Sequence, residues 1–243
     1  MELSKLVQTG IQNKPPRIVI HGVHGVGKST LAANAPNPIF LQTEDGLTSI
    51  DVPHFPLATE LQQVWDYMGT LVKEDHDYKT FVLDTADWLQ TLIWNQVCID
   101  NDKDSIEKIG YAKGYIFAMK YFEKFFRGVD KLREQGMAIV ILAHNEIKPF
   151  NPPDGEAYDR YQIKLHKHAA TKLEEWADCV LFANFKVITT EDNNKSKVVN
   201  STPQRVLYSS NRPAWRAKTR YPDMPDEMEM DFDVILKSIK GVK

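Results

Sequence analysis

The chain has 243 residues, of which 42% are hydrophobic, and its formal net charge is -3. This length suits a single domain with one substantial core. The net charge is slightly negative, so the protein as a whole does not attract a polyanion, and any nucleic-acid contact must use a local basic patch. Cys98 and Cys179 lie far apart and form no CxxC pair, which argues against a disulfide framework and a zinc ribbon. No apolar run is typical of a signal peptide or a membrane span, so we expect a cytoplasmic protein with no membrane partner.

The chain begins with a lead-in over residues 1–16, which ends in Lys14-Pro15-Pro16, and we expect a single domain over residues 17–243. Several apolar runs after the lead-in lack period-two alternation, which is typical of strands buried on both faces of a parallel sheet. These runs are residues 17–21, 39–43, 80–84, 137–143 and 179–187. Helical spacing over residues 61–72 and 117–132, between the runs, predicts a three-layer α/β fold with a mainly parallel central sheet.

The last third of the chain has a different pattern. Residues 187–208, interrupted at Glu191-Asp192-Asn193-Asn194, predict a C-terminal β-hairpin, and residues 232–240 predict a closing helix. Residues 151–162 are polar and rich in Pro and Gly, and we expect them to form a mobile functional loop.

One motif carries most of the chemical information. Gly22-Val23-His24-Gly25-Val26-Gly27-Lys28-Ser29 fits the pattern G-x-x-x-x-G-K-[ST], with a predicted strand before it and a helix that opens at Ser29-Thr30. In such a loop the backbone N–H groups bind phosphates, Lys28 reaches the β- and γ-phosphates, and the Ser29 hydroxyl binds Mg²⁺. The alternative is a chance glycine-rich turn, which the flanking elements disfavour. We therefore predict a nucleotide site that includes residues 22–30.

Three further strand ends carry polar residues. Asp84 closes an apolar run in the manner of a Walker B strand, whose Asp holds the magnesium ion, although a buried strand capped by an acid has the same pattern. Thr85 follows Asp84, so the catalytic base must come from elsewhere. Glu44, after the second run, is our candidate, with Asp45 or Asp87 as alternatives. His144 ends the fourth run, where it either senses the γ-phosphate or is an ordinary hydrogen-bonded histidine.

A basic pair follows the predicted hairpin. Lys218 and Arg220 are two residues apart on an extended segment, so their side chains should point the same way. Two cations aimed together suit the γ-phosphate of a neighbouring subunit, as an arginine finger does, and the alternative is a solvated basic strand edge.

The order of these features resembles the RecA/DnaB-type ATPase core over roughly residues 17 to 225. The step Ala177-Asp178 into a strand and the late K-x-R pair are similar to replicative helicase motors. The compact size and the His144 strand end look more like phage nucleotide-binding proteins, which are RecA-like annealing and recombination factors. Relatives usually have Gln near the position of His144, which is a departure.

This resemblance implies ATP and Mg²⁺ as cofactors, Glu44 as the catalytic acid, and Lys218 and Arg220 acting in trans within a homo-oligomeric ring or filament. It also implies the host cell cytoplasm if a phage encodes the chain, and a single-strand-binding protein as a further partner.

RecA-like cores that resemble this chain hold single-stranded DNA on two loops, and both have candidates here. Cations that follow phosphates, mixed with aromatic rings that stack on bases, suit a sequence-tolerant site. The candidate DNA contacts are Lys108, Tyr111, Lys113, Lys148, Arg160, Lys164 and Lys167, in residues 108–114 and 146–172. The alternative is a solvated loop and a charged helix face, which nearby acids support.

Together these features predict a Mg²⁺-dependent ATPase that acts on single-stranded DNA in recombination, annealing or repair. The rival predictions are a helicase-type or helicase-loader motor, and a regulatory ATPase switch that binds no DNA. A small-molecule kinase is a weaker alternative, because no lid or acceptor pocket is evident.

Overall fold

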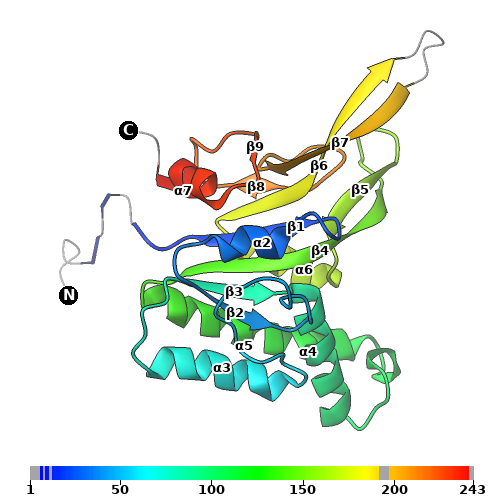
Figure 1. Cartoon of the computed structure of the whole chain (residues 1–243). Coiled ribbons are helices and arrows are strands. Elements are labelled where there is room, and N and C mark those ends of the chain that lie inside the picture. The colour runs from blue at the N-terminus through cyan, green and yellow to red at the C-terminus, as the bar shows by residue number, and fades with distance from the viewer. Residues whose placement is uncertain (1–5, 8, 11–12, 192–196, 241–243) are drawn as a thin grey trace.

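The computed structural model describes residues 6–7, 9–10, 13–191 and 197–240. In this part of the chain nine strands form one sheet of order β2-β3-β4-β1-β6-β7-β9, with β5 paired to β4 and β8 to β6 (Figure 1). The strands are β1 (Arg17–Gly22), β2 (Pro38–Gln42), β3 (Thr80–Asp84), β4 (Ala138–Phe150), β5 (Tyr158–Ile163), β6 (Cys179–Glu191), β7 (Lys197–Tyr208), β8 (Lys218–Thr219) and β9 (Glu227–Glu229). The helices are α2 (Lys28–Ala33), α3 (Leu61–Lys73), α4 (Ala86–Asp100), the 3-10 helix η1 (Ile106–Lys108), α5 (Lys113–Glu134), α6 (Lys167–Trp176) and α7 (Phe232–Lys240).

The five strands from β2 to β6 in this order run parallel, so their carboxyl ends share one edge of the sheet. The register pairs Gly22 with His144 on one side and with Ala183 on the other, and it pairs Gln42 with Asp84. Strand β4 lies between β1 and β3. His144 therefore lies between the phosphate loop and Asp84, at the edge where open α/β sheets bind ligands.

Helices cover both faces of the sheet. Along β1, Val19 packs with α3, α4, α5 and α6, whereas Ile18 and Ile20 pack with α2 and α7. In Figure 1 the first group lies below the sheet, and α2 and α7 lie above it. The predicted three-layer α/β fold with a mainly parallel sheet is confirmed, and α7 has the predicted bounds.

Strand β6 is longer than expected because it belongs to two parts of the sheet. It pairs parallel with β1 at its start and antiparallel with β7 further along, and the β6–β7 arm projects from the sheet (Figure 1). The predicted hairpin is therefore confirmed, but its first arm extends back to Cys179. Asp192, Asn193 and Asn194 of the predicted turn lie outside the described residues.

The expectation of a mobile loop over residues 151–162 is wrong for its second half. Residues 158–163 form β5, which pairs antiparallel with the outer half of β4, from Asn145↔Ile163 to Phe150↔Tyr158. Strand β5 is only partly exposed, because Arg160 and Ile163 are buried, whereas the outer half of β4 is largely exposed. Residues 146–163 are thus a β-hairpin, and α6 follows.

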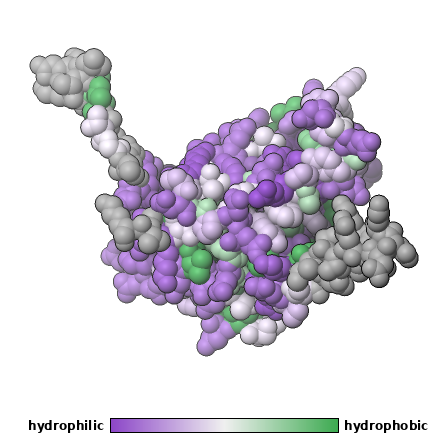
Figure 2. Space-filling model, turned by 90° about the horizontal axis from the view of Figure 1, so that it is seen from above, coloured by the Kyte–Doolittle hydropathy of each residue, from purple (hydrophilic) through white to green (hydrophobic). Residues whose placement is uncertain are grey.

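The surface seen from above in Figure 2 is covered mainly by hydrophilic residues, with small hydrophobic spots. Among the helices that the structure describes, none has the length and apolar character needed to cross a membrane. Exposed aromatic side chains in the described part include Tyr111, which is 97% exposed, and Trp88, which is 46% exposed.

His21 on β1 predicts a pH dependence of stability. Its Nε2 donates to the Arg216 carbonyl oxygen at 2.7 Å, its Nδ1 has no hydrogen-bond partner in the part of the chain that the structure describes, and burial lowers its pKa to about 4. The unfolded chain takes up a proton at His21 below about pH 6.5, whereas the folded protein does so only near pH 4. The free energy of unfolding should therefore fall by about 3 kcal/mol from this group as the pH drops through that range.

Urea unfolding at several pH values, on the wild type and on His21→Phe, measures this effect. The aromatic replacement keeps the contact with Phe182, whose ring centroid lies 5.1 Å from that of His21, and removes the titration. We expect a flatter pH profile for the variant, and equal slopes in both proteins would contradict the assignment.

Candidate nucleotide-binding site

The phosphate loop links β1 to α2 and depends on two glycines. A Cβ on Gly22 would lie 2.1 Å from the Ala183 carbonyl oxygen, so only glycine fits between β1 and β6. Gly27, which precedes α2, has a φ of +96°, a backbone conformation that glycine adopts without strain. These constraints explain in three dimensions why the motif needs glycine at both positions.

Lys28 is buried at the centre of the loop. Its Nζ donates to the carbonyl oxygens of Gly22 and Val23 at 3.1 and 3.2 Å. Burial lowers its pKa below the usual value, although Asp84, Asp87 and Glu44 act in the opposite direction. An ammonium group that bonds only to neutral carbonyls gains energy from an anion, because charge-assisted hydrogen bonds are stronger. The loop therefore fits a phosphate group.

Ser29 and Asp84 form the cation-binding half of the site. The Ser29 hydroxyl donates to Asp84 Oδ2 at 2.6 Å. Burial raises the pKa of Asp84, while the hydrogen bond from Ser29 opposes that shift. A carboxylate in a dry environment is stabilised by a cation, and Mg²⁺ prefers oxygen ligands with few carboxylates when phosphates complete its shell. These two side chains therefore fit magnesium.

Glu44 lies beside the end of β3. The backbone N–H groups of Thr43 and Glu44 donate to the Asp84 carbonyl oxygen at 2.7 and 3.3 Å, and the Thr85 hydroxyl donates to Glu44 Oε2 at 3.4 Å. Asp45 is exposed and does not line the pocket that contains Lys28 and Asp84. Both carboxylate oxygens of Asp87 already accept hydrogen bonds. Of these three acids, Glu44 alone lines the pocket that contains Lys28 and Asp84.

His144 connects several of these groups. Its backbone N–H and its Nδ1 contact the two oxygens of Asp87 at 3.0 and 2.9 Å, which places the proton on Nδ1. Burial by itself would raise the pKa of Asp87, but the hydrogen bonds from His144 hold it below its usual value. The His144 ring stacks on His24 of the phosphate loop with a centroid distance of 4.0 Å, and its Nε2 lies 3.8 Å from Glu44 Oε2.

These residues surround one pocket of about 280 Å³. It is lined by Gly25, Gly27, Lys28, Ser29, Thr30, Glu44, Gly46, Ser49, Ile50, Asp84, Thr85 and His144. The residues that the sequence places in the phosphate loop, after β2, at the end of β3 and at His144 therefore come together at one edge of the sheet.

Lys218 and Arg220 lie at the opposite edge. Arg220 contacts Asp178 Oδ1 at 3.2 Å, and both basic side chains reach the Glu175 carbonyl oxygen. Asp178 bonds to Arg17 at the amino end of β1, whereas the phosphate loop follows the carboxyl end. The pair therefore points the same way, as expected, and lies away from the phosphate loop of its own chain.

The candidate DNA contacts differ in their surroundings. Arg160 is only 9% exposed, lies over the Phe150 ring and bonds to Tyr158 and to the Pro213 carbonyl oxygen, so its guanidinium is occupied within the chain. Lys108 pairs with Asp104 at 2.5 Å. Tyr111 is in the turn between η1 and α5, and Lys113 begins α5. Lys167 is exposed and begins α6.

A second cavity of about 590 Å³ adjoins the nucleotide pocket. Asp87, which bonds to His144, lines this cavity together with Lys148 and Lys164. Its remaining lining residues are Trp88, Gln90, Thr91, Trp94, Glu146, Leu165 and His166. The His166 ring stacks on Tyr115 of α5 with a centroid distance of 4.2 Å. This cavity combines aromatic side chains with cations.

Sequence reasoning missed three features of these sites. Trp88 and Trp94 of α4 both line the second cavity; Trp88 is exposed, whereas Trp94 is partly buried against the core, so the exposed aromatic Trp88 was the available signal. Arg205 on β7 approaches Gly27: a Cβ there would lie 2.9 Å from Arg205 Nη1. No local pattern marks Arg205, because the contact depends on the pairing of distant strands.

A comparison with family models gives one match: a model described as an AAA domain covers residues 14–221. The matched range includes the phosphate loop, Glu44, Asp84, His144 and the Lys218/Arg220 pair, and it ends before α7. No curated protein matches the chain.

Proposed function

We propose that this chain, which belongs to the AAA domain family, is a Mg²⁺-dependent ATPase that acts on single-stranded DNA in recombination, annealing or repair. Family membership supports a P-loop ATPase that hydrolyses nucleotide. The observation that carries the proposal further is the position of Asp87, which bonds to His144 in the nucleotide pocket and lines the neighbouring aromatic cavity.

The nucleotide site acts through the groups already described. Lys28 would transfer its hydrogen bonds from the loop carbonyls to phosphate oxygens, and the Ser29 hydroxyl and the Asp84 carboxylate would hold magnesium. When bound, the metal neutralises charge that develops on the phosphates. Glu44 orients the attacking water and accepts its proton, and the Thr85 hydroxyl keeps the carboxylate in position.

His144 is suited to report the state of the nucleotide. Its ring is fixed by Asp87 on one side and by stacking on His24 on the other, and its Nε2 faces Glu44. A change in charge at the γ-phosphate position therefore acts on the His144 ring, which bonds to Asp87, a residue that lines the second cavity.

The second cavity supports the DNA part of the proposal. Its aromatic rings offer stacking surfaces for unpaired bases, and Lys148 and Lys164 offer charges for the backbone. Lys148 is also bonded to Glu146 at 2.7 Å, so part of its charge is compensated. Lys108, Tyr111, Lys113 and Lys167 do not line this cavity and stay predicted DNA contacts.

A shared catalytic site is part of the same proposal. Lys218 and Arg220 project from the edge opposite the phosphate loop, so head-to-tail assembly is the arrangement in which they reach the γ-phosphate bound by a neighbour. The proposed assembly is a ring or a filament of identical subunits. A single-strand-binding protein is a further proposed partner.

The proposed function is tested by the rate of ATP hydrolysis with and without single-stranded DNA, at low and high salt. We expect DNA to raise the rate, and we expect the stimulation to weaken as salt competes for the phosphates. Hydrolysis that is indifferent to DNA would favour a regulatory switch instead, and strand displacement would favour a helicase-type motor.

Trp88→Ala tests the cavity itself. Stacking on an aromatic side chain is worth about 1–3 kcal/mol per base, so we expect DNA affinity to fall about fivefold to a hundredfold. Fluorescence anisotropy with a labelled oligonucleotide measures it. Trp65→Ala is the matched control, because Trp65 is a partly buried tryptophan on α3, outside the cavity lining. Equal DNA affinity of the two variants would count against the cavity as the binding site.

A further inference from the structure

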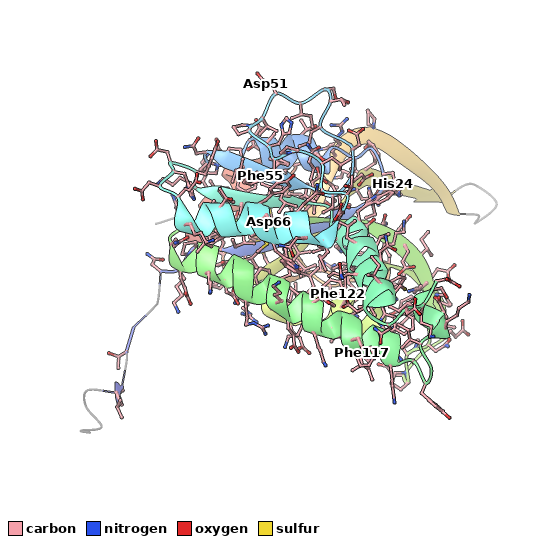
Figure 3. The ribbon with its side chains drawn as sticks, turned by 90° about the horizontal axis from the view of Figure 1, so that it is seen from below. His24, Asp51, Phe55, Asp66, Phe117 and Phe122 are labelled. Atoms are coloured by element: carbon pink, nitrogen blue, oxygen red, sulfur yellow. The ribbon has the colours of Figure 1, made fainter. Side chains whose placement is uncertain are left out.

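The β6–β7 arm brings an arginine to the phosphate loop of its own chain. Arg205 pairs with Phe185 on β6, two residues beyond Ala183, which packs against Gly22 at the start of the loop. A Cβ on Gly27 would lie 2.9 Å from Arg205 Nη1 and 3.6 Å from its Cζ, so the guanidinium occupies the space beside the residue before Lys28. Figure 3 labels His24 of the same loop, whose ring stacks on His144.

The charge of Arg205 has no counterpart in the described part of the chain. Arg212, Arg216 and Arg220 each contact a carboxylate within 3.2 Å, whereas no such contact is found for Arg205 among the described residues. Its side chain is exposed, and the nearest catalytic cation, Lys28, bonds only to carbonyl oxygens. Two positive groups thus lie at one loop, and neither forms an ion pair with a carboxylate among the described residues, an arrangement that a polyphosphate would stabilise.

We propose that Arg205 is a nucleotide-binding residue that contacts a phosphate oxygen at the loop, in the same subunit as Lys28. The planar guanidinium donates in a fixed fork that matches phosphate geometry, and its exposed position lets it meet an incoming ligand without prior desolvation. This contact differs from the proposed finger formed by Lys218 and Arg220, which lies at the other edge of the sheet.

The proposed contact has a structural consequence. Arg205 belongs to β7, and β7 forms the second arm of the projecting hairpin. A phosphate held by both Lys28 and Arg205 joins β7 to the phosphate loop, so nucleotide binding should restrain this strand. The restraint needs no DNA and no second subunit, which separates it from the function proposed above.

Arg205→Ala tests the contact by calorimetric titration with ATP and with inorganic tripolyphosphate. Loss of one charge-assisted hydrogen bond predicts affinities about tenfold to a hundredfold weaker for both ligands. ATP affinity within twofold of the wild type would overturn the proposal. A weaker affinity for ATP with unchanged affinity for tripolyphosphate would also overturn it, because the residue would then contact the nucleoside.

Arg127→Ala is the matched control. Arg127 is an exposed arginine on α5 with no carboxylate contact among the described residues, and it lies outside the nucleotide pocket. We expect its ligand affinities to equal those of the wild type, and an equal loss in both variants would overturn a local role for Arg205.

Hydrogen exchange gives a second, independent readout. We expect ATP to slow amide exchange in β7 of the wild type and to have no such effect in Arg205→Ala at saturating ATP. Equal slowing in both proteins would overturn the link between β7 and the loop. If the Arg205 proposal fails, the phosphate-loop assignment still stands, because the Lys28 variants test that assignment separately.

Discussion

Replacing Lys28 with alanine should abolish measurable nucleotide binding. The ammonium group is the buried cation of the loop, and its replacement removes charge-assisted hydrogen bonds worth about 1.5–3 kcal/mol each. Two or more such bonds to phosphate predict an affinity lower by about 3 kcal/mol or more, which is over a hundredfold. Calorimetric titration with ATP measures the change, and turnover should fall with it.

Stability must be checked in the same variant. The Lys28 side chain also donates to the carbonyl oxygens of Gly22 and Val23, so its removal acts on the empty loop as well. Lys28→Met keeps most of the packing volume and serves as the second variant, and thermal unfolding shows whether each protein is folded. Normal ATP turnover in a folded Lys28 variant would contradict the phosphate-loop assignment.

A mixture of two inactive variants should regain hydrolysis. Glu44→Ala removes the proposed base, which is worth about a hundredfold to ten-thousandfold in rate, and Arg220→Ala removes a proposed finger, worth about a thousandfold or more. Both should bind ATP and hydrolyse it poorly. In a mixed assembly, some interfaces combine the intact Glu44 of an Arg220→Ala subunit with the intact Arg220 of a neighbouring Glu44→Ala subunit. Mixing should therefore restore part of the activity.

The experiment needs a control because Arg220 also forms an ion pair within its own chain. Its guanidinium contacts Asp178 and the Glu175 carbonyl oxygen, so alanine also removes an internal contact. Arg212→Ala removes a comparable exposed pair, with Asp226 at 3.0 Å, and should keep full hydrolysis. Failure of the two inactive variants to complement each other would count against a shared site.

Much of the fold followed from local pattern. The phosphate loop, the strand that ends at Asp84 and the helix over residues 232–240 were predicted with nearly their observed bounds, because motif spacing and apolar periodicity act over a few consecutive residues. The arm over residues 146–163 differs from the expected loop because its pairing joins a polar segment to the outer half of β4, and Arg160, a polar residue, takes one of its buried positions. Arg160 illustrates the same limit, since its stacking on Phe150 depends on the pairing of β4 with β5.

Eight consecutive residues are enough to predict the phosphate loop, with Lys28 and Ser29 as its expected ligands, because the motif is local. The other groups that meet this loop are set by contacts between distant parts of the chain. The register of β4 between β1 and β3 places His144 beside Glu44, and it lets Asp87 line a second cavity. The return of β7 brings Arg205 to Gly27. These contacts join residues far apart in the chain, and strand pairing and packing of the whole sheet determine them.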